Sequence, residues 1–364
     1  MTTTYRYLFA DLLTNNIIAE LPLTGVSFTQ QLNQAGTFTG HLLLSGLNTD
    51  AFNAIEGTIP AKTGIYVDRN GTLIWGGVIW GRPYNSDEQK LTLQAREFES
   101  YFERRKITTT TVFTNIDQLA IAQNLISQAQ SAAYGNIGVQ IGTETSGVTL
   151  SRTYYDYEYK QVYGAIQDLA RQENGFDFNI QVAYDGSGNP TKTLRLGYPR
   201  IGTSYSSTSA TIPVFELPAS NIVSYDLSED GSITANTIYA LGAGSNEGKL
   251  IETAQDTTKF TAGYPLLEEQ VNYSEVTDST YLAELATGQV LALSNPVTIF
   301  RVTVPAYVAP EFGTYELGDD IRLRITDNRF ETTLDEVYRL VGLTVEPGEN
   351  GPERVVLTLT NTTN

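Results

Sequence analysis

Hydrophobic and polar residues alternate in short runs along most of the chain. The amino-terminal stretch "YRYLFADLLTNNIIAELPL" contains two such runs around Thr14-Asn15-Asn16, residues that accept the backbone angles of a tight turn. Five further runs follow, rich in β-branched and aromatic residues and bounded by Gly and Asn: "GVSFTQQL", "GTFTGHLLL", "TGIYVDRN", "TLIWGGVIW" and "KLTLQAREF". This pattern is typical of strands. It predicts a hairpin within a compact antiparallel domain over residues 1–107.

The periodicity then changes to that of helices. Thr114 to Asp117 match a helix-start capping box. Apolar residues at helical spacing follow it: Leu119, Ile121, Ala122, Leu125 and Ile126. A second helix is predicted from about Lys160 to Asn174, with Gly175 as its stop, and "FDFNIQVAYD", "GSGNP" and "TKTLRLGYP" predict a hairpin. Residues 108–210 are therefore expected to form a smaller α+β domain.

From about residue 211 the chain is β-rich again, and motifs of the first domain return in the same order. "AELPLTGVSF" from Ala19 resembles "FELPASNIVSY" from Phe215, and each is followed by a related strand start, "GTFTG" from Gly36 and "GSITA" from Gly231. Three more stretches follow in the same order: "GTIPAKTGIYV" lines up without gaps on "GTYELGDDIRL", then "LIWGGVIW" on "YRLVGLTV", and "KLTLQA" on "RVVLTLT". The predicted fold is mainly β, with two similar antiparallel β-barrel domains, 1–107 and 211–364, flanking the α+β domain.

The second copy carries a longer insertion, at about residues 245–295. It includes "STYLAELATGQVLAL", where apolar residues such as Leu282 and Leu285 keep helical spacing. The nearby "ALGAGSNEGK" contains glycines and a lysine but lacks the spacing of a phosphate-binding loop. We interpret it as an ordinary loop.

Composition excludes several chemistries. The chain has no Cys and one His, so a thiolate metal site, a thiol nucleophile and a two-histidine metal site are all impossible. His41 lies in the alternating "FTGHLLL", for which we expect a structural role. Paired carboxylates for glycoside hydrolysis cannot be singled out among 41 acidic residues. We predict that the protein is not an enzyme and has no catalytic residue, cofactor or metal site.

Charge and hydropathy also limit the partners. A net charge of -18 disfavours tight binding to phosphates, because nucleic-acid affinity comes mainly from Lys and Arg. No apolar stretch approaches the length that crosses a bilayer, and the amino terminus lacks the order of a signal peptide. We therefore expect a chain that is made in the cytoplasm and does not insert into a membrane.

Both tryptophans lie in one predicted strand. Trp75 and Trp80 are five residues apart, so a regular strand directs them to opposite faces and they do not line one pocket. One is expected to fill the barrel and the other to meet a neighbouring domain or subunit. Gly76, Gly77 and Gly81 predict a bulge or a close backbone approach. An aromatic platform for a sugar is the alternative.

Two further segments are candidate contact surfaces. "RTYYDYEYKQVYG" brings five tyrosines next to Asp156 and Glu158, and it favours an interface or packing role over calcium or carbohydrate binding: Tyr154, Tyr155, Tyr157, Tyr159 and Tyr163. "AREFESYFERRKI" is expected to fix the exit from the first domain through ion pairs, with a solvated face as the alternative: Arg96, Arg104, Arg105 and Lys106 with Glu97, Glu99 and Glu103.

A duplicated barrel suits ring building. Three chains with two similar barrels each supply six similar surfaces, so one ring can dock a three-fold object on one side and a six-fold object on the other. Closed symmetry gives every repeated interface a partner, and neighbours in the ring cover the sheet edges.

The succession of motifs resembles the siphophage baseplate hub, or tail-tip hub, proteins, a tail-associated family similar to the hub of contractile phage baseplates. The resemblance covers nearly the whole chain and rests on these stretches in order: the Trp strand with "KLTLQAREFESYFERRKI", "VYGAIQDLARQENGFDFNI", "LRLGYPRIG", "IVSYDLSEDGSITANTIYALGAG", and "YELGDDIRLRI" with "VYRLVGLTV".

The resemblance implies a structural virion protein at the phage tail tip. Such a hub is a homotrimer whose pseudo-six-fold ring adapts the hexameric tail tube and distal tail protein ring to a three-fold central fibre or spike. A tape measure protein is a further candidate partner. Genomic DNA is expected to pass through without specific binding, past acidic residues that repel phosphates.

Two alternatives and one departure accompany this expectation. A receptor- or glycan-binding tail adhesin would use the tyrosines and tryptophans, and a tail-associated cell-wall hydrolase is disfavoured by the single histidine and absent cysteine. Many relatives carry a carboxy-terminal fibre or hydrolase, whereas this sequence stops at "VVLTLTNTTN". We therefore expect the spike, fibre or lytic enzyme to be a separate protein. The resemblance leans towards long non-contractile tails.

Overall fold

The computed structural model describes residues 3–45, 50–172, 174–206, 209–218, 221–348 and 351–361. The described chain is mainly β with few helices, which confirms the predicted fold class. Ala219 and Ser220, inside the second "FELPASNIVSY" motif, and the last three residues lie outside the described residues.

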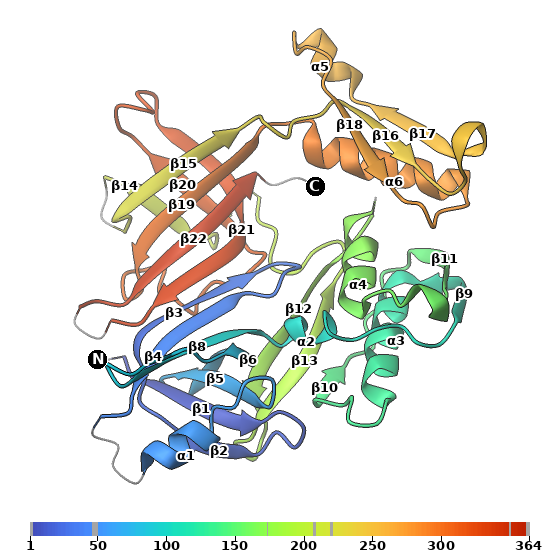
Figure 1. Ribbon diagram of the computed structural model, residues 1–364. Coiled ribbons are helices and arrows are strands. Elements are labelled where there is room, and N and C mark those ends of the chain that lie inside the picture. Colours follow the sequence, from blue (N-terminus) through green and yellow to red (C-terminus); the bar gives the residue numbers. More distant parts are fainter. Residues whose placement is uncertain are drawn as a thin grey trace.

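A fourteen-stranded sheet forms the body of the molecule (Figure 1). Its main path runs β15-β19-β22-β21-β3-β4-β8-β6-β5-β1-β2. Off this path, β20 pairs with β21, β14 pairs with β20, and β7 pairs with β8. The strands before residue 98 are called the first repeat: β1 (Tyr5–Asp11), β2 (Ile17–Glu20), β3 (Thr24–Gln31), β4 (Thr37–Leu43), β5 (Thr63–Arg69), β6 (Thr72–Gly81), β7 (Tyr84–Asn85) and β8 (Lys90–Glu97), with helix α1 (Asp50–Glu56) between β4 and β5.

The remaining strands of this sheet are called the second repeat: β14 (Val214–Leu217), β15 (Ser224–Asp230), β19 (Val297–Pro305), β20 (Asp320–Ile325), β21 (Leu334–Glu346) and β22 (Arg354–Asn361). Five of them repeat an order found in the first. The antiparallel ladder β3-β4-β8-β6-β5 is matched by the antiparallel ladder β15-β19-β22-β21-β20. The structure therefore carries the predicted duplication. The copies differ at the last position, where β1 pairs antiparallel with β5 but β14 pairs parallel with β20.

Each repeat is curled around its own side of a shared core. The rings of Tyr7 on β1 and Phe38 on β4 lie 6.3 Å apart, whereas a flat sheet would separate these strands by about 19 Å. In the described residues the ladder does not close on itself within either repeat. Instead β3 pairs antiparallel with β21, so the two predicted barrels are curled parts of one continuous sheet.

The sequence match of "LIWGGVIW" with "YRLVGLTV" is wrong by four residues. The ladder of β6 to β8 is irregular between Ile79 and Gly81, and that of β21 to β22 between Leu340 and Gly342. Gly81 is therefore the counterpart of Gly342, where the sequence match had placed Gly77. An even shift leaves the alternation of inward and outward residues unchanged, so the hydrophobic pattern does not reveal it.

The second repeat is interrupted by a small unit between β15 and β19. Its three-stranded sheet and helix have a separate core, and the unit takes the place of the short turn between β3 and β4: β16 (Thr237–Leu241), η2 (Asn246–Gly248), β17 (Ile251–Gln255), α5 (Thr257–Thr261), β18 (Glu268–Asn272) and α6 (Ser279–Leu293). The predicted helix is confirmed as α6. The strand expected from Gly231 is wrong, since residues 231–236 form no strand, and β16 begins ahead of the expected insertion start at about 245.

Residues 98–213 carry most of the other helices and two small sheets. Their elements pack against the outer face of the first repeat through a second hydrophobic cluster: α2 (Glu99–Phe102), β9 (Thr111–Asp117), α3 (Gln118–Ser131), β10 (Val139–Ile141), β11 (Thr149–Tyr154), η1 (Asp156–Glu158), α4 (Val162–Arg171), β12 (Asp177–Tyr184) and β13 (Pro190–Gly197). Both predicted helices and the hairpin β12–β13 are present.

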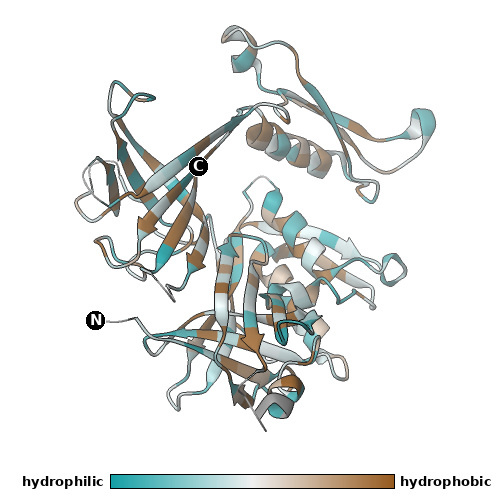
Figure 2. Cartoon of the chain, turned by 60° about the vertical axis from the view of Figure 1, so that its left-hand side comes forward, coloured by the Kyte–Doolittle hydropathy of each residue, from teal (hydrophilic) through white to brown (hydrophobic). Residues whose placement is uncertain are grey.

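The helix ends in this region follow simple rules. The capping box was placed one turn early, because Thr114 lies in β9 and Asp117 caps α3 by accepting a bond from the Leu119 N–H. Gly175 follows α4, and a Cβ there would lie 2.0 Å from the Ala170 carbonyl oxygen, so this turn needs glycine. Figure 2 shows the hydrophobic residues gathered on the strands of the main sheet and on α6. Among the described residues, no helix is long and apolar enough to cross a membrane.

Candidate assembly sites

Trp75 and Trp80 leave β6 on opposite faces, as predicted. Trp75 is fully buried in the core of the first repeat, where its Nε1–H donates to the Thr29 carbonyl oxygen at 2.9 Å. Trp80 packs against the second cluster and donates to Ser100 Oγ on α2 at 2.8 Å. One ring therefore fills the sheet's core and the other joins it to the α+β region, so they do not form a shared sugar platform.

The glycines beside the tryptophans permit close packing. A Cβ on Gly76 would lie 2.8 Å from Phe98 and 2.9 Å from Val182, and one on Gly77 would lie 2.2 Å from the Arg96 carbonyl oxygen. Gly81 follows the irregularity in the ladder to β8. The predicted close approach and bulge are both present.

The charged exit segment works mainly through buried carboxylates. Arg96 and Glu103 form a bidentate ion pair at 2.6 and 2.7 Å, which is the predicted kind of contact. Glu99 is buried and accepts a bond from the Ile180 N–H on β12. Burial raises the pKa of Glu99 to about 7. Glu97 is also buried and accepts from the Gly36 N–H at 2.7 Å, and burial together with the charge of Glu99 raises its pKa.

The other basic residues of this segment do less. Arg105 donates to the Tyr101 hydroxyl at 2.7 Å, while Arg104 and Lys106 are exposed and form no ion pair among the described residues.

The tyrosine segment divides into packing and surface residues. Tyr154 and Tyr163 are buried in the second cluster. Tyr155, Tyr157 and Tyr159 are exposed, and the rings of the first two stack with centroids 5.1 Å apart. Two of the five therefore stabilise the fold, and the interface role of the other three stays a prediction.

His41 lies on β4 and bonds across the sheet. Its Nδ1 is 3.1 Å from the Thr92 hydroxyl on β8, and its ring covers Gly25. This is a structural arrangement, as expected. The described residues contain no group of three His, Cys, Asp or Glu side chains that could hold a metal ion.

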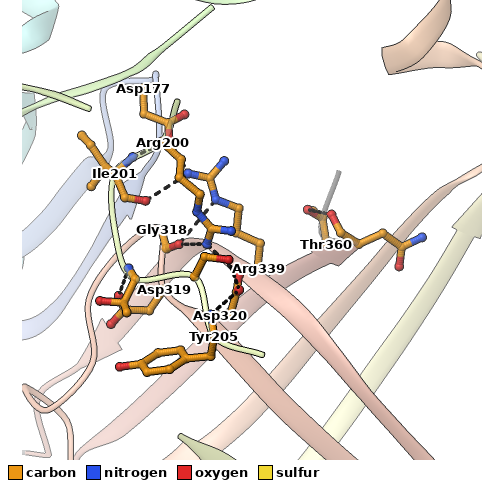
Figure 3. A network of polar contacts seen from close by, with 12 residues as sticks. Asp177, Arg200, Ile201, Tyr205, Gly318, Asp319, Asp320, Arg339 and Thr360 are labelled. Atoms are coloured by element: carbon orange, nitrogen blue, oxygen red, sulfur yellow. Dashed lines mark hydrogen bonds and ion pairs between the residues drawn. The ribbon is translucent and has the colours of Figure 1, made fainter. Parts of the chain in front are cut away.

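A polar network, called the junction network, locks the second repeat to the α+β region (Figure 3). Arg339 on β21 donates to Asp177 at the start of β12, and to the Ile201 carbonyl oxygen at 3.1 Å. Arg200 donates to Asp320 at 2.6 Å and to the Gly318 carbonyl oxygen. Both arginines are largely buried, as are their carboxylate partners. Breaking one of these pairs would leave a buried charge without a partner, which is costly.

Two glycines let the chain cross itself within this network. Gly202 and Gly318 have φ of +83° and +92°. A Cβ on Gly318 would lie 2.1 Å from the Ile201 carbonyl oxygen, and one on Gly202 would lie 2.2 Å from the Gly318 carbonyl carbon. Neither position accepts a larger residue without moving backbone.

A further ion pair joins the two repeats directly. Arg69 on β5 forms a bidentate pair with Glu353, just before β22, at 2.8 Å for both bonds. The Tyr5 hydroxyl donates to the same carboxylate, and burial, with Glu353 beside it, raises the Tyr5 pKa. Together with the β3–β21 ladder, this pair holds the repeats in one orientation.

Comparison of the solved structures identifies the fold. The tail protein of Neisseria meningitidis MC58 superposes with a TM-score of 0.64 at 12% identity, covering 100% of this chain and 97% of that chain. The 43 kDa tail protein of prophage MuSo2 from Shewanella oneidensis gives 0.60 at 14% identity, covering 98% of both chains. The fold is that of phage tail proteins. The prophage tail protein gp18 of Listeria monocytogenes EGD-e has the same tail-protein fold, with a TM-score of 0.54 at 12% identity and coverage of 98% and 94%.

Comparison of the sequence alone with family models and with curated proteins gave no match. Sequence reasoning also missed the junction network. Its residues come from four separate stretches of sequence, and no local periodicity marks them. A sequence signal for it is Gly318 in "YELGDDIRLRI", because glycine is the residue type that readily adopts the positive φ found there.

Proposed function

We propose that this protein is a structural hub of a phage tail tip, part of the virion and without catalytic activity. The observation that carries the proposal is the repeated five-strand ladder, whose two copies are joined edge to edge by β3 and β21. Three such chains offer six similar lobes, and closed symmetry leaves no lobe without a neighbour. The tail-protein fold supports this place of action.

In this proposal the hub is a homotrimer between partners of different symmetry. One face of the ring meets the hexameric tail tube or the distal tail protein ring, and the other a three-fold central fibre or spike, with the tape measure protein as a further partner. The regions 1–107, 108–210 and 211–364 are the proposed working domains. Genomic DNA passes through the ring, and the net charge of -18 keeps phosphates from adhering.

The test is the mass of the purified chain in solution, followed by electron microscopy of the assembly. We expect a trimer of the 39.9 kDa chain, seen in projection as a ring of six similar lobes. A protein that stays monomeric at every concentration, or a ring without six lobes, would contradict the proposal.

A further inference from the structure

Strand β15 has one edge without a partner strand, whereas the corresponding edge of β3 in the first repeat is paired. In the described residues β15 pairs with β19 alone, whereas β3, which has the same place in the first repeat, pairs with β4 on one edge and β21 on the other. The outer edge of β15 therefore presents free backbone donors and acceptors, which a sheet edge normally covers or protects.

The ladder registers identify which residues of β15 correspond to the paired part of β3. Phe28 lies opposite Phe38, and Leu227 lies opposite Phe300. Phe38 and Phe300 in turn lie opposite counterparts in β8 and β22. Leu227–Asp230 thus match Phe28–Gln31, the four residues of β3 that pair with β21.

The segment of β21 that pairs with β3 also has a counterpart in the first repeat, and that counterpart has no partner strand on the equivalent edge. Gly342–Val345 of β21 pair with β3, and their counterparts, by the shared irregularity, are Gly81–Tyr84. Val345 is fully buried under β3, whereas Tyr84 is 54% exposed. A second exposed edge of matching geometry therefore lies on the first repeat.

We propose that Leu227–Asp230 of one chain pair with Gly81–Tyr84 of a second copy of this chain, in the register of the β3–β21 ladder. The proposal rests on the proposed trimeric hub and names the interface that closes it. Tyr84 then lies opposite Leu227, and Arg82 lies opposite Glu229.

The backbone of the first-repeat edge suits this pairing. The Leu32 N–H donates to the Val341 carbonyl oxygen at 3.0 Å, so alternate residues of β21, including Leu343 and Val345, direct their backbone groups towards β3. Their counterparts are Arg82 and Tyr84. Between them, the Pro83 carbonyl accepts from the Thr92 N–H on β8 at 2.9 Å. The N–H that proline lacks would therefore point towards β8. The opposite edge, which faces the proposed partner, keeps the backbone N–H and C=O groups of Arg82 and Tyr84.

The side chains fit the register as well. The uncharged pair of Leu343 and Gln30 inside the chain is replaced by Arg82 and Glu229, opposite charges at directly opposed positions, which stabilise a strand pair. Within the chain, Arg82 Nη1 donates to Thr58 Oγ1 at 3.0 Å and to the Ile55 carbonyl oxygen, so the proposed pair with Glu229 uses the Nε and Nη2 donors. Glu229 is exposed and its present partner, Arg329 at 3.0 Å, is exposed too, so the carboxylate is accessible to a neighbour. Tyr84 and Leu227, two residues along from that pair, bring apolar surface together on the same face.

Cysteine cross-linking tests the register directly, because the chain has no cysteine. Pro83 and Ser228 are both exposed and correspond to the pair Thr344 and Thr29, a position without mutual hydrogen bonds where Cα atoms lie about 4.5 Å apart and a disulfide fits. The double variant Pro83→Cys/Ser228→Cys should oxidise to a covalent trimer on a non-reducing gel and return to monomer with reductant.

The matched control is Pro83→Cys/Asp226→Cys, which moves one thiol two residues along the same exposed strand face. It should cross-link at least ten-fold less. Mixing the two single variants Pro83→Cys and Ser228→Cys should yield covalent dimers but no covalent trimers. A second test uses no thiols. Glu229→Arg should raise the trimer dissociation constant at least ten-fold, whereas the control Glu331→Arg, at another exposed acidic residue, should leave it unchanged.

The outcomes separate this interface from the proposed function. A stable trimer that does not cross-link, or a control that cross-links equally well, overturns the interface and leaves the hub standing. Covalent chains longer than three support the edge pairing and contradict the trimeric hub. A monomer that never cross-links contradicts both.

Discussion

At the scale of single residues, stability rests on buried polar groups that bond to specific partners. Trp75 bonds to Thr29, Glu99 to Ile180, and Arg339 to Asp177. Each partner is distant in sequence, so removing one side chain affects two segments at once. Single substitutions at these positions should therefore change the free energy of unfolding measurably.

Trp75→Phe should destabilise the chain by about 2–4 kcal/mol. The change leaves a cavity in the core of the first repeat and leaves the Thr29 carbonyl oxygen without the donor that bonds it. Denaturant unfolding followed by tyrosine fluorescence or circular dichroism measures the loss. Trp80→Phe, at a half-buried site, is the control and should cost less than half as much; equal losses would contradict this account.

Glu99→Gln should change how stability depends on pH. Burial raises the pKa of Glu99 to about 7 from a usual 4.5, so the folded chain holds this proton more tightly than the unfolded chain does. The stability from that proton is fully present below about pH 4.5 and is lost as pH rises through about 7. Glutamine mimics the protonated acid at every pH.

Unfolding free energies of the two proteins at pH 5 and pH 8 therefore provide the check. Relative to wild type, the variant should gain up to roughly 3 kcal/mol between these values, at 1.36 kcal/mol for each pKa unit. The same difference at both pH values would show that Glu99 does not titrate in this range.

At the scale of elements, alternation was enough to predict most strands of the main sheet and their order of repetition. The register between repeats was not predictable, because the correct alignment of Gly81 with Gly342 and the false one with Gly77 differ by an even number of residues. The parallel pairing of β14 and the strand β9 before α3 were also missed, since neither has a local signal distinct from any other extended segment.

The candidate assembly sites could be predicted only in part from the sequence. The opposite faces of Trp75 and Trp80 follow from strand geometry alone, and the structure agrees. The tyrosines look alike in sequence, yet Tyr154 is buried and Tyr157 exposed, because β11 ends at Tyr154 and Tyr157 lies in the 3-10 turn η1 that follows. Contacts such as Arg339 with Asp177 depend on tertiary approach and carry no sequence signature.

Gly318→Ala should be much more destabilising than Gly313→Ala. Both glycines have positive φ, +92° and +102°, so both substitutions carry backbone strain of about 1–2 kcal/mol. A Cβ on Gly318 also meets the Ile201 carbonyl oxygen at 2.1 Å, whereas nothing lies within 4 Å of one on Gly313. We expect a loss of at least about 3 kcal/mol for Gly318→Ala. The melting temperatures of the two variants measure the difference in stability. Equal decreases would contradict the steric clash expected between residue 318 and the Ile201 carbonyl oxygen.

At the scale of the whole molecule, the buried hydrophobic residues of the described chain form three separate cores. The two large ones share β6, whose faces belong to different cores, while the small core of β16, β17, β18 and α6 shares no buried residue with them. The small unit touches the α+β region through Tyr281, whose ring lies 3.2 Å from the Arg152 guanidinium. It is thus an addition to the sheet and not part of its core.

Replacing residues 231–296 with the first-repeat turn Leu32–Gly36 should leave the remaining chain folded. The β15–β19 ladder persists without the unit, as the β3–β4 ladder does in the first repeat. Circular dichroism and a single cooperative unfolding transition are the measurements. Loss of cooperative unfolding would show that the unit supports the main sheet.

The β3–β21 ladder has a mechanical consequence. Hydrogen bonds run without interruption from β2 to β15, so pulling or twisting one repeat loads the other through backbone bonds sheared in parallel. The Arg69–Glu353 pair and the junction network block the remaining freedom to bend. We therefore expect the curled sheet to move as one stiff body, so that motion during its work arises at its borders with neighbouring chains or in the small unit between β15 and β19.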